Sequence, residues 1–480
     1  VKKITGDMLM RGGREAAMNH GPIAMRHFTR DKSELVVFIH QGLLCLARQP
    51  RLAVAVAARL TAMGPAQRSL ADTAPFQYVQ TRQLADLGAQ ADAEHLSWFA
   101  RPLGYALAQR TLQAERDRND TAERGDLIES LQATGFEALQ GAGGRLTFGS
   151  GSYDTVHRMA FYAPDRANWP GSMKLLSFAN GAGLEQIPDW VPANLSTHVS
   201  LNINIQEAFD HVVPLFDRVK GGPNSEGLWE RTLRRVASRR PGSPGVDIRE
   251  QIIQRLGWQC HIVTDNKPSP AGQLMGPNDE RLLFAMPIRA LATDGGMNQA
   301  ESMVADGIAK ILAPDTQHVR RETELAPGQV IWSLLRDRDE SNVQLDDVRI
   351  EFDGHVNVQE APAVLELEPS AVCVAHGHLF YATHVSLMAE ILANIASLNS
   401  NPSAARPPLA DSAEYAAVVA ALKREAAARG WDQACLLRFA RTDEEIRGTY
   451  ELTQQRRLRE SQTLTARAIR AIPGFGGMDG

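Results

Sequence analysis

The chain has 480 residues, of which 44% are hydrophobic and 22% charged, and its formal net charge is -5. This is the composition of an ordinary globular protein, long enough for roughly three domains of about 150 residues. The mildly acidic balance argues against general binding to nucleic acid or to an anionic membrane. The longest apolar runs, at 35–47 and 52–63, are too short for a transmembrane helix.

Two further features of the chain argue against a disulfide framework and against a signal peptide. Its four cysteines are far apart and lack metal-ligand spacing, so each is expected to be a small buried apolar residue rather than half of a disulfide: Cys45, Cys260, Cys373 and Cys435. Residues 1–30 contain basic residues without an uninterrupted apolar stretch, and so do not read as a signal peptide.

The first third of the chain alternates between strand and helix patterns. Residues 33–40 read as a strand that enters a helix over 41–49. The composition of 51–63 and 81–118 is helical, which indicates a helical insertion. A Gly/Ser-rich turn within 143–162 then predicts a β-hairpin.

A second strand-into-helix step follows, and it carries the clearest periodicity in the chain. Apolar residues alternate with polar ones over 197–205, which predicts a strand with one buried face and with His198, Ser200, Asn202 and Asn204 on the other. Helical spacing takes over from 205 to 219, where Asn204 and Glu207 form a capping box. A helix at 247–258 and strands at 259–265 and 281–288 come next.

The similar order of elements predicts an α+β protein built from two divergent repeats. Each repeat is expected to be an antiparallel sheet backed by helices on one face, because strands joined by tight turns pair antiparallel. The proline-rich stretch 400–409 reads as a linker to a mostly helical tail. The predicted organisation is an N-terminal segment 1–32, units at 33–172 and 188–399, the linker 400–409 and the C-terminal region 410–480.

Four stretches carry a resemblance: WVPANLSTHVSLNINIQEAFDHVVPLFD, VDIREQIIQRLG, ERLLFAMPI and SAVCVAHGHLFYATHVSLMAEIL, all within residues 126–395. Their order resembles that of a broad family of uncharacterised bacterial exported proteins that contain a domain of unknown function. The resemblance implies an envelope-associated or periplasmic protein, usually with a signal peptide or membrane anchor. It supplies no catalytic residues.

The histidines near the end of the second unit are the candidate metal ligands. His376, His378 and His384 lie close together in sequence, with Cys373 just before them, and an H-x-H pair on a strand projects both rings to one face. The competing interpretation places them at an exposed turn between two apolar strands. Any metal or catalytic group is therefore expected at this end of the sheet.

Two charged stretches are candidate ion-binding sites. Arg231, Arg234 and Arg235, with Arg239 and Arg240 beyond them, make a basic helix face that could bind phosphate or acidic groups, or could simply be solvated. The acidic stretch 337–347 begins like a calcium loop, but Asn342 replaces the turn glycine and Val348 the final bidentate ligand. A solvated connection is the simpler interpretation.

No nucleotide or catalytic motif is present. The glycines of 141–152 and 178–183 form neither a P-loop nor a dinucleotide fingerprint, so no cofactor is expected. These observations favour a non-enzymatic envelope protein that binds an envelope protein or polysaccharide, or assembles with itself, and not a nucleic-acid-binding protein. The alternative is a hydrolase or other enzyme whose site is not evident from motifs.

Overall fold

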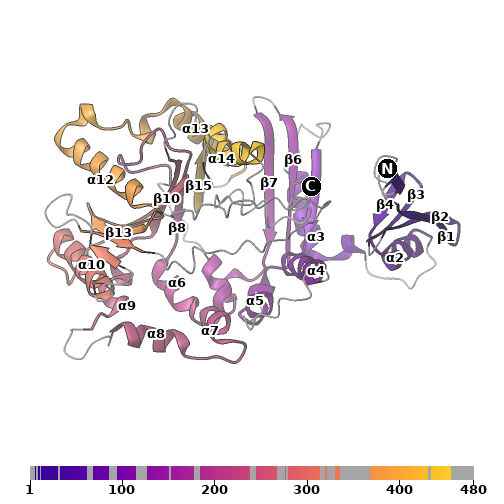
Figure 1. Cartoon of the computed structure of the whole chain (residues 1–480), viewed down its shortest axis with the longest axis horizontal. Coiled ribbons are helices and arrows are strands. Elements are labelled where there is room, and N and C mark those ends of the chain that lie inside the picture. Colours follow the sequence, from indigo (N-terminus) through magenta and orange to yellow (C-terminus); the bar gives the residue numbers. More distant parts are fainter. Residues whose placement is uncertain are drawn as a thin grey trace, which may run out of the picture. The chain divides into compact units, whose positions relative to one another are not determined.

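The computed structural model divides into two compact units, Val1–Arg101 with Gln140–Tyr162, and Pro102–Leu139 with Ala163–Gly480. Each unit is considered by itself. The structure describes residues 6, 9–10, 12–30, 33–61, 69–85, 95–114, 127–150, 153–177, 184–237, 245–267, 276, 279–313, 319–321, 330–335, 368–430 and 434–455. The architecture is α+β with antiparallel sheets, as predicted (Figure 1).

The first unit begins with a four-stranded antiparallel meander in the order β1-β2-β3-β4. Its strands are β1 (Arg14–His20), β2 (Ile23–Arg30), β3 (Ser33–His40) and β4 (Leu43–Ala47), and α2 (Pro50–Leu60) packs on one face. The predicted helix over 41–49 is wrong. Gln41 and Gly42 have φ of 47° and 79°, which makes a two-residue hairpin turn, so the apolar stretch after it returns as a strand. Residues 1–32 are not a separate segment either, since β2 pairs with β3.

A separate three-stranded sheet completes this unit and contains the predicted hairpin. Its strands are β5 (His95–Ala100), β6 (Gly141–Ser150) and β7 (Tyr153–Tyr162), accompanied by η1 (Leu70–Asp72) and α3 (Ala74–Ala85). Helix α3 approaches β6 closely because a glycine faces it. A Cβ at Gly143 would lie only 2.5 Å from Cγ1 of Val79.

The second unit is organised around one eight-stranded sheet in which all neighbouring strands are antiparallel, in the order β11-β12-β13-β14-β10-β9-β8-β15. The strands are β8 (Thr197–Asn202), β9 (Gln259–Asn266), β10 (Glu280–Pro287), β11 (Val319–Arg321), β12 (Ile331–Leu334), β13 (Ser370–Ala375), β14 (His378–Ala382) and β15 (Leu436–Ala440).

Helices cover this sheet on both faces, not on one as predicted (Figure 1). On one face α12 (Val385–Ser400) buries Leu387, Met388 and Ile391 against the sheet. On the other, α10 (Met297–Leu312) buries Ala300 and Val304, beside α9 (Ile248–Gln251). The polar side of β8 is a buried side because it lies on the α12 face, where His198 pairs with Val263 of the α12 cluster.

The remaining helices surround the sheet or lead into it. They are α4 (Pro102–Ala114), α5 (Leu127–Ala133), η2 (Phe136–Ala138), η3 (Arg166–Asn168), η4 (Gly171–Leu176), α6 (Ile205–His211), α7 (Val213–Gly221), α8 (Leu228–Ala237), η5 (Ile253–Arg255), η6 (Pro402–Ala404), η7 (Leu409–Asp411), α13 (Ala413–Ala428) and α14 (Thr442–Gln454). The Asn204 side chain accepts from Glu207 N at the start of α6, which is the N-cap half of the predicted capping box.

The predicted linker 400–409 is not a domain boundary. Leu409 is fully buried, and its N–H donates to the carbonyl of Val191 over 2.7 Å, while Ala193 N donates to Pro407 O over 2.8 Å. Beyond it, β15 of the C-terminal region pairs with β8 and extends the same sheet.

The predicted repeat is also unsupported, because the first unit has two separate meanders and the second has one sheet of different strand order.

A buried ion-pair network joins this sheet to α12. Arg281 on β10 is 1% exposed. Its guanidinium donates to both carboxylate oxygens of Asp265 on β9, over 2.9 and 2.7 Å, and to both of Glu390 on α12, over 2.6 and 3.2 Å. Arg406 approaches Glu390 to 3.1 Å from the segment after α12. Burial alone would raise the pKa of Glu390, but the two arginines together lower it.

Asp265→Ala should lower the free energy of unfolding by about 3 to 5 kcal/mol, because it leaves part of a buried guanidinium unpaired. Urea unfolding followed by tryptophan fluorescence measures this loss. The matched control is Lys423→Ala, which breaks the exposed Lys423–Glu185 pair and should cost less than about 1 kcal/mol. Equal losses in the two variants would show that the network does not stabilise the fold.

Candidate functional site

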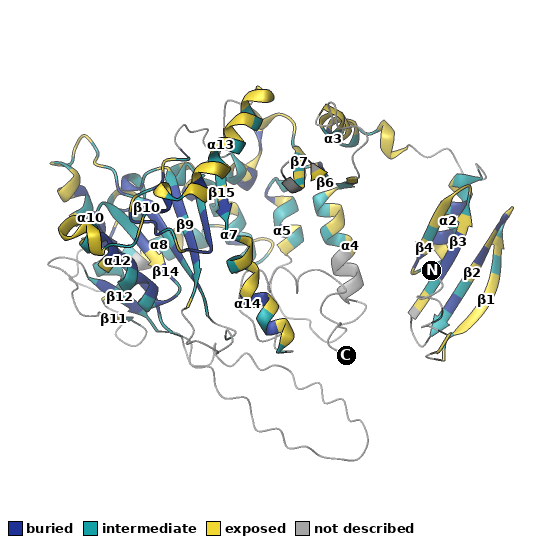
Figure 2. Cartoon of the chain, turned by 90° about the horizontal axis from the view of Figure 1, so that it is seen from above, coloured by how far each residue is buried: buried dark blue, intermediate teal, exposed yellow. Residues whose placement is uncertain are grey.

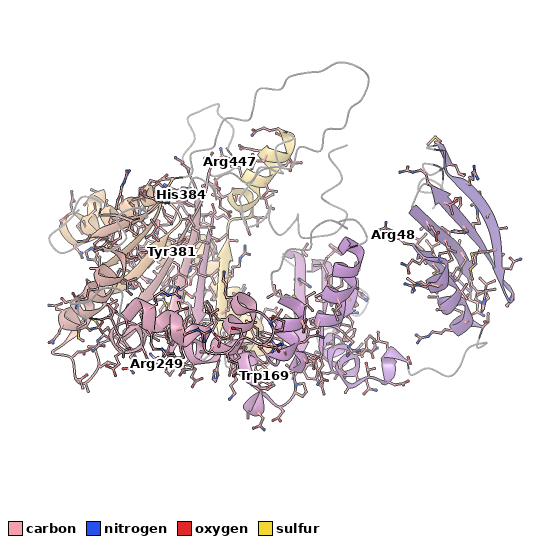
Figure 3. The ribbon with its side chains drawn as sticks, turned by 60° about the horizontal axis from the view of Figure 1, so that its bottom comes forward. Arg48, Trp169, Arg249, Tyr381, His384 and Arg447 are labelled. Carbon is pink, nitrogen blue, oxygen red and sulfur yellow. The ribbon has the colours of Figure 1, made fainter. Side chains whose placement is uncertain are left out.

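One row of side chains on the α10 face of the eight-stranded sheet remains half-exposed. The row crosses six adjacent strands, and we call it the aromatic row: Trp332, Val372, Tyr381, Phe284, Ile262 and Val199. Tyr381 is 39% exposed and its five companions are intermediate. Figure 3 labels Tyr381 on the sheet. An apolar row left partly open across a sheet is a surface on which another molecule can pack.

The row stays open because the helices of that face cover only the neighbouring residues of the sheet. Val374 and Met286 each lie two residues beyond the row on their own strands, and both are buried in a cluster with Ala300 and Val304 of α10. Phe284 and Ile262 touch this cluster only at its margin. The strand register therefore decides which side chains are covered and which remain accessible.

A pocket of about 200 Å³ lies at the Trp332 end of the aromatic row. It is formed between α10 and strands β12 and β13, and its lining is mainly apolar: Ala305, Asp306, Ile308, Ala309, Val330, Trp332 and Val374. Asp306 forms an ion pair with Lys310 one helical turn away. The pocket is smaller than the roughly 300 to 1,000 Å³ of sites that enclose drug-sized ligands. Its size suits a single apolar side chain of a partner.

The three predicted metal ligands do not come together. His376 occupies the turn before β14 with φ of 51°, and His378 begins β14. His384, labelled in Figure 3, lies beyond the other end of β14, at the start of α12. His378 Nδ1 is 2.9 Å from His376 O, and His384 Nδ1 is 2.9 Å from Thr383 Oγ1. Across the described part of the chain, no three His, Cys, Asp or Glu side chains are grouped to hold a metal ion.

His378, which is half-buried, instead belongs to a group that sequence reasoning missed, the histidine cluster of His198, His261 and His378. His198 Nε2 lies 3.3 Å from His261 Nδ1, and the two rings stack with centroids 5.5 Å apart. Trp190 packs edge-on against His261 and His378, at centroid distances of 6.3 and 5.8 Å. His198 and His261 were expected to be ordinary strand residues, with His198 on the open side of β8, but they are 0% and 3% exposed.

Burial keeps these imidazoles neutral. It lowers the pKa of His198 to about 4, and burial together with the charges of His198 and His378 lowers that of His261 to about 3. We assign the shared proton to His198 Nε2, which then donates to His261 Nδ1. Among the described residues, His198 Nδ1 has no hydrogen-bond partner. In this tautomer Nδ1 carries a lone pair, so no N–H group is left unpaired there. A general base must reach its substrate, and the rings of His198 and His261 are buried.

The three described residues of the predicted basic face lie on the surface of one helix. Arg231, Arg234 and Arg235 are exposed on α8. Arg231 Nη1 donates to Glu226 O over 3.1 Å, and Arg234 Nε lies 3.4 Å from Glu230 O. Arg239 and Arg240, like the acidic stretch 337–347, lie outside the described residues. Arg231 and Arg234 thus contact the backbone carbonyls of neighbouring acidic residues, and anion binding by this face stays a prediction.

Comparison with known proteins gives no family for this chain. Scans of protein-family models, curated proteins and solved structures each returned no match. Within the ranges that the structure describes, each helix is too short or too polar to cross a membrane.

The histidine cluster should make the fold acid-sensitive. In the unfolded chain a histidine has a pKa of about 6.5, so on acidification the unfolded state binds protons before His198 and His261 do. Stability is therefore full above about pH 6.5 and falls as pH drops toward the folded pKa, by on the order of 3 kcal/mol for His198.

Urea unfolding between pH 7 and 5 measures this slope before most carboxylates titrate. The double variant His198→Leu/His261→Leu removes both partners of the hydrogen bond and should flatten the pH dependence. An unchanged slope in that variant would assign the acid sensitivity to other groups.

Proposed function

We propose that this protein is a non-enzymatic binding or assembly protein, and that its partner packs on the aromatic row. The observation that supports this is the continuity of the row. Six strands each contribute one apolar side chain to a single line, and three of them are aromatic: Trp332, Tyr381 and Phe284. Aromatic residues are enriched in protein interfaces and carry much of their binding energy.

The chemistry of the row favours a protein partner over a polysaccharide. A sugar chain needs hydrogen-bonding groups beside the aromatic rings, whereas Val372, Ile262 and Val199 present only methyl groups. The row meets a charged residue at its β15 end, where Arg438 follows Val199 and forms an ion pair with Glu445. An apolar row with a pocket for one side chain suits an apolar segment of another protein.

A hydrolase is the second candidate function, and the site supports it less well. The histidine cluster has perturbed proton affinities, but burial causes the shifts, and the two most perturbed rings are out of reach of a substrate. The carboxylate that lines the pocket beside Trp332 already forms an ion pair. A cell-envelope location remains part of the proposal on the strength of the family resemblance alone.

Site-specific photo-crosslinking tests the proposed surface. A photoreactive phenylalanine analogue at position 381, in protein returned to its own host cells, should give a discrete adduct identifiable by mass spectrometry. The matched control places the same analogue at Leu422 of α13, which is 47% exposed and lies away from the row in sequence and fold. Adding Trp332→Asp should reduce the position-381 adduct at least about tenfold, by removing an interface anchor.

The proposal fails if position 381 yields no adduct, or if the adduct persists unchanged in the Trp332→Asp background. Identical adducts at positions 381 and 422 would also contradict it, because they would reflect proximity in the cell rather than docking on the row.

A further inference from the structure

A second surface, on the first unit, is distinguished by an unprotected sheet edge. β4 lies at the end of the four-stranded sheet, and the described residues pair it with β3 alone (Figure 2). Its sequence, LLCLA, contains no charge and no proline. Leu43, Leu44 and Leu46 are 46%, 44% and 48% exposed, and neighbouring Ile39 is 68% exposed. Proteins usually protect edge strands with charges, prolines or bulges, and β4 has none of these within it.

The hairpin geometry shows which backbone groups of β4 face outward. The two-residue turn at Gln41 and Gly42 closes on a hydrogen-bonded pair, His40 with Leu43. Hydrogen-bonded and non-hydrogen-bonded pairs alternate along an antiparallel ladder, so Leu43, Cys45 and Ala47 bond toward β3. The N–H and C=O groups of Leu44 and Leu46 therefore point to the open edge.

We propose that β4 pairs antiparallel with β4 of a second copy of this chain, about a two-fold axis at Cys45. In this register Leu44 faces Leu46 of the partner subunit at a hydrogen-bonded position, and Leu46 faces the partner's Leu44. Leu43 faces the partner's Ala47. The pairing joins two four-stranded sheets and brings Leu44 and Leu46 of both chains together on one face.

The charge pattern of β4 selects a second copy as the occupant. A two-fold axis sets each strand against itself, so any charge in β4 would be placed close to its own symmetry mate. β4 carries no charge between Leu43 and Ala47, and it is apolar on both sides of Cys45. The strand is self-complementary in both hydrogen bonding and side-chain chemistry. This inference is independent of the aromatic row, which lies on the other unit.

Cys45 provides a reporter for this register. The backbone N–H and C=O of Cys45 bond to β3. Cys45 and the partner's Cys45 therefore form a non-hydrogen-bonded pair across the axis, with Cα atoms about 4.5 Å apart. A disulfide accepts Cα separations of roughly 4.4 to 6.8 Å. Diamide should link the two chains there, taking up the two electrons and two protons that the thiols release as the S–S bond forms. Burial raises the pKa of the Cys45 thiol, so the reaction belongs at mildly alkaline pH.

The test measures oligomeric state by light scattering and sedimentation, together with diamide crosslinking in a Cys435→Ser background. Cys435→Ser protein should be dimeric and should form a covalent dimer that Cys45→Ser abolishes. Leu44→Lys/Leu46→Lys sets like charges opposite each other twice and should weaken the dimer about tenfold or more. Leu44→Lys/Leu46→Glu sets opposite charges against each other and should restore it. Leu422→Lys, at an exposed site on α13, should leave the dimer unchanged.

Failure of the Lys/Glu variant to recover the dimer that the Lys/Lys variant loses would overturn the register. A monomer in the Cys435→Ser protein, or a dimer indifferent to both double variants, would overturn the interface. Circular dichroism of each variant separates lost pairing from lost folding. These positions are about half exposed, so the fold of the first unit should tolerate the substitutions.

Discussion

The buried guanidinium of Arg281 constrains the arrangement of the second unit. It is held by a carboxylate on β9 and a carboxylate on α12, and Arg406 extends the network to the segment that follows α12. A charge so deeply buried is costly to leave unpaired, so the sheet, the helix and the returning segment must keep their relative positions. That segment bonds to the backbone of Val191 and Ala193 and thereby leads the chain to β15 at the sheet edge.

Coverage of the sheet by two helical layers has opposite consequences on its two faces. On the α12 face the core is complete, and residues of polar type such as His198 and Ser200 are fully buried. On the other face α9 and α10 cover one part, and the aromatic row beside it remains half-exposed. The residues that look polar in sequence are thus inside, and a row that looks like core is partly accessible. Burial here follows the placement of the helices more than residue type.

The two exposed apolar surfaces differ in what they offer a partner. The aromatic row presents side chains from strands whose backbone groups are already paired within the sheet, so recognition there depends on shape and apolar contact. The edge of β4 presents backbone donors and acceptors as well as leucines, so recognition depends on strand pairing. Each unit therefore has an apolar surface of a different kind.

The sequence by itself determined the α+β class, the strand at 197–202, the cap at Asn204 and the β6–β7 hairpin, because period and turn chemistry are local properties. It misassigned 41–49, where a short apolar run fits strand and helix equally and the positive φ of Gln41 decides. Only the tertiary structure decided that β15 returns to β8, that His198 meets His261 from 63 residues away and that the aromatic row forms. Those pairings depend on strand order and helix placement, and neither leaves a periodic signal in the chain.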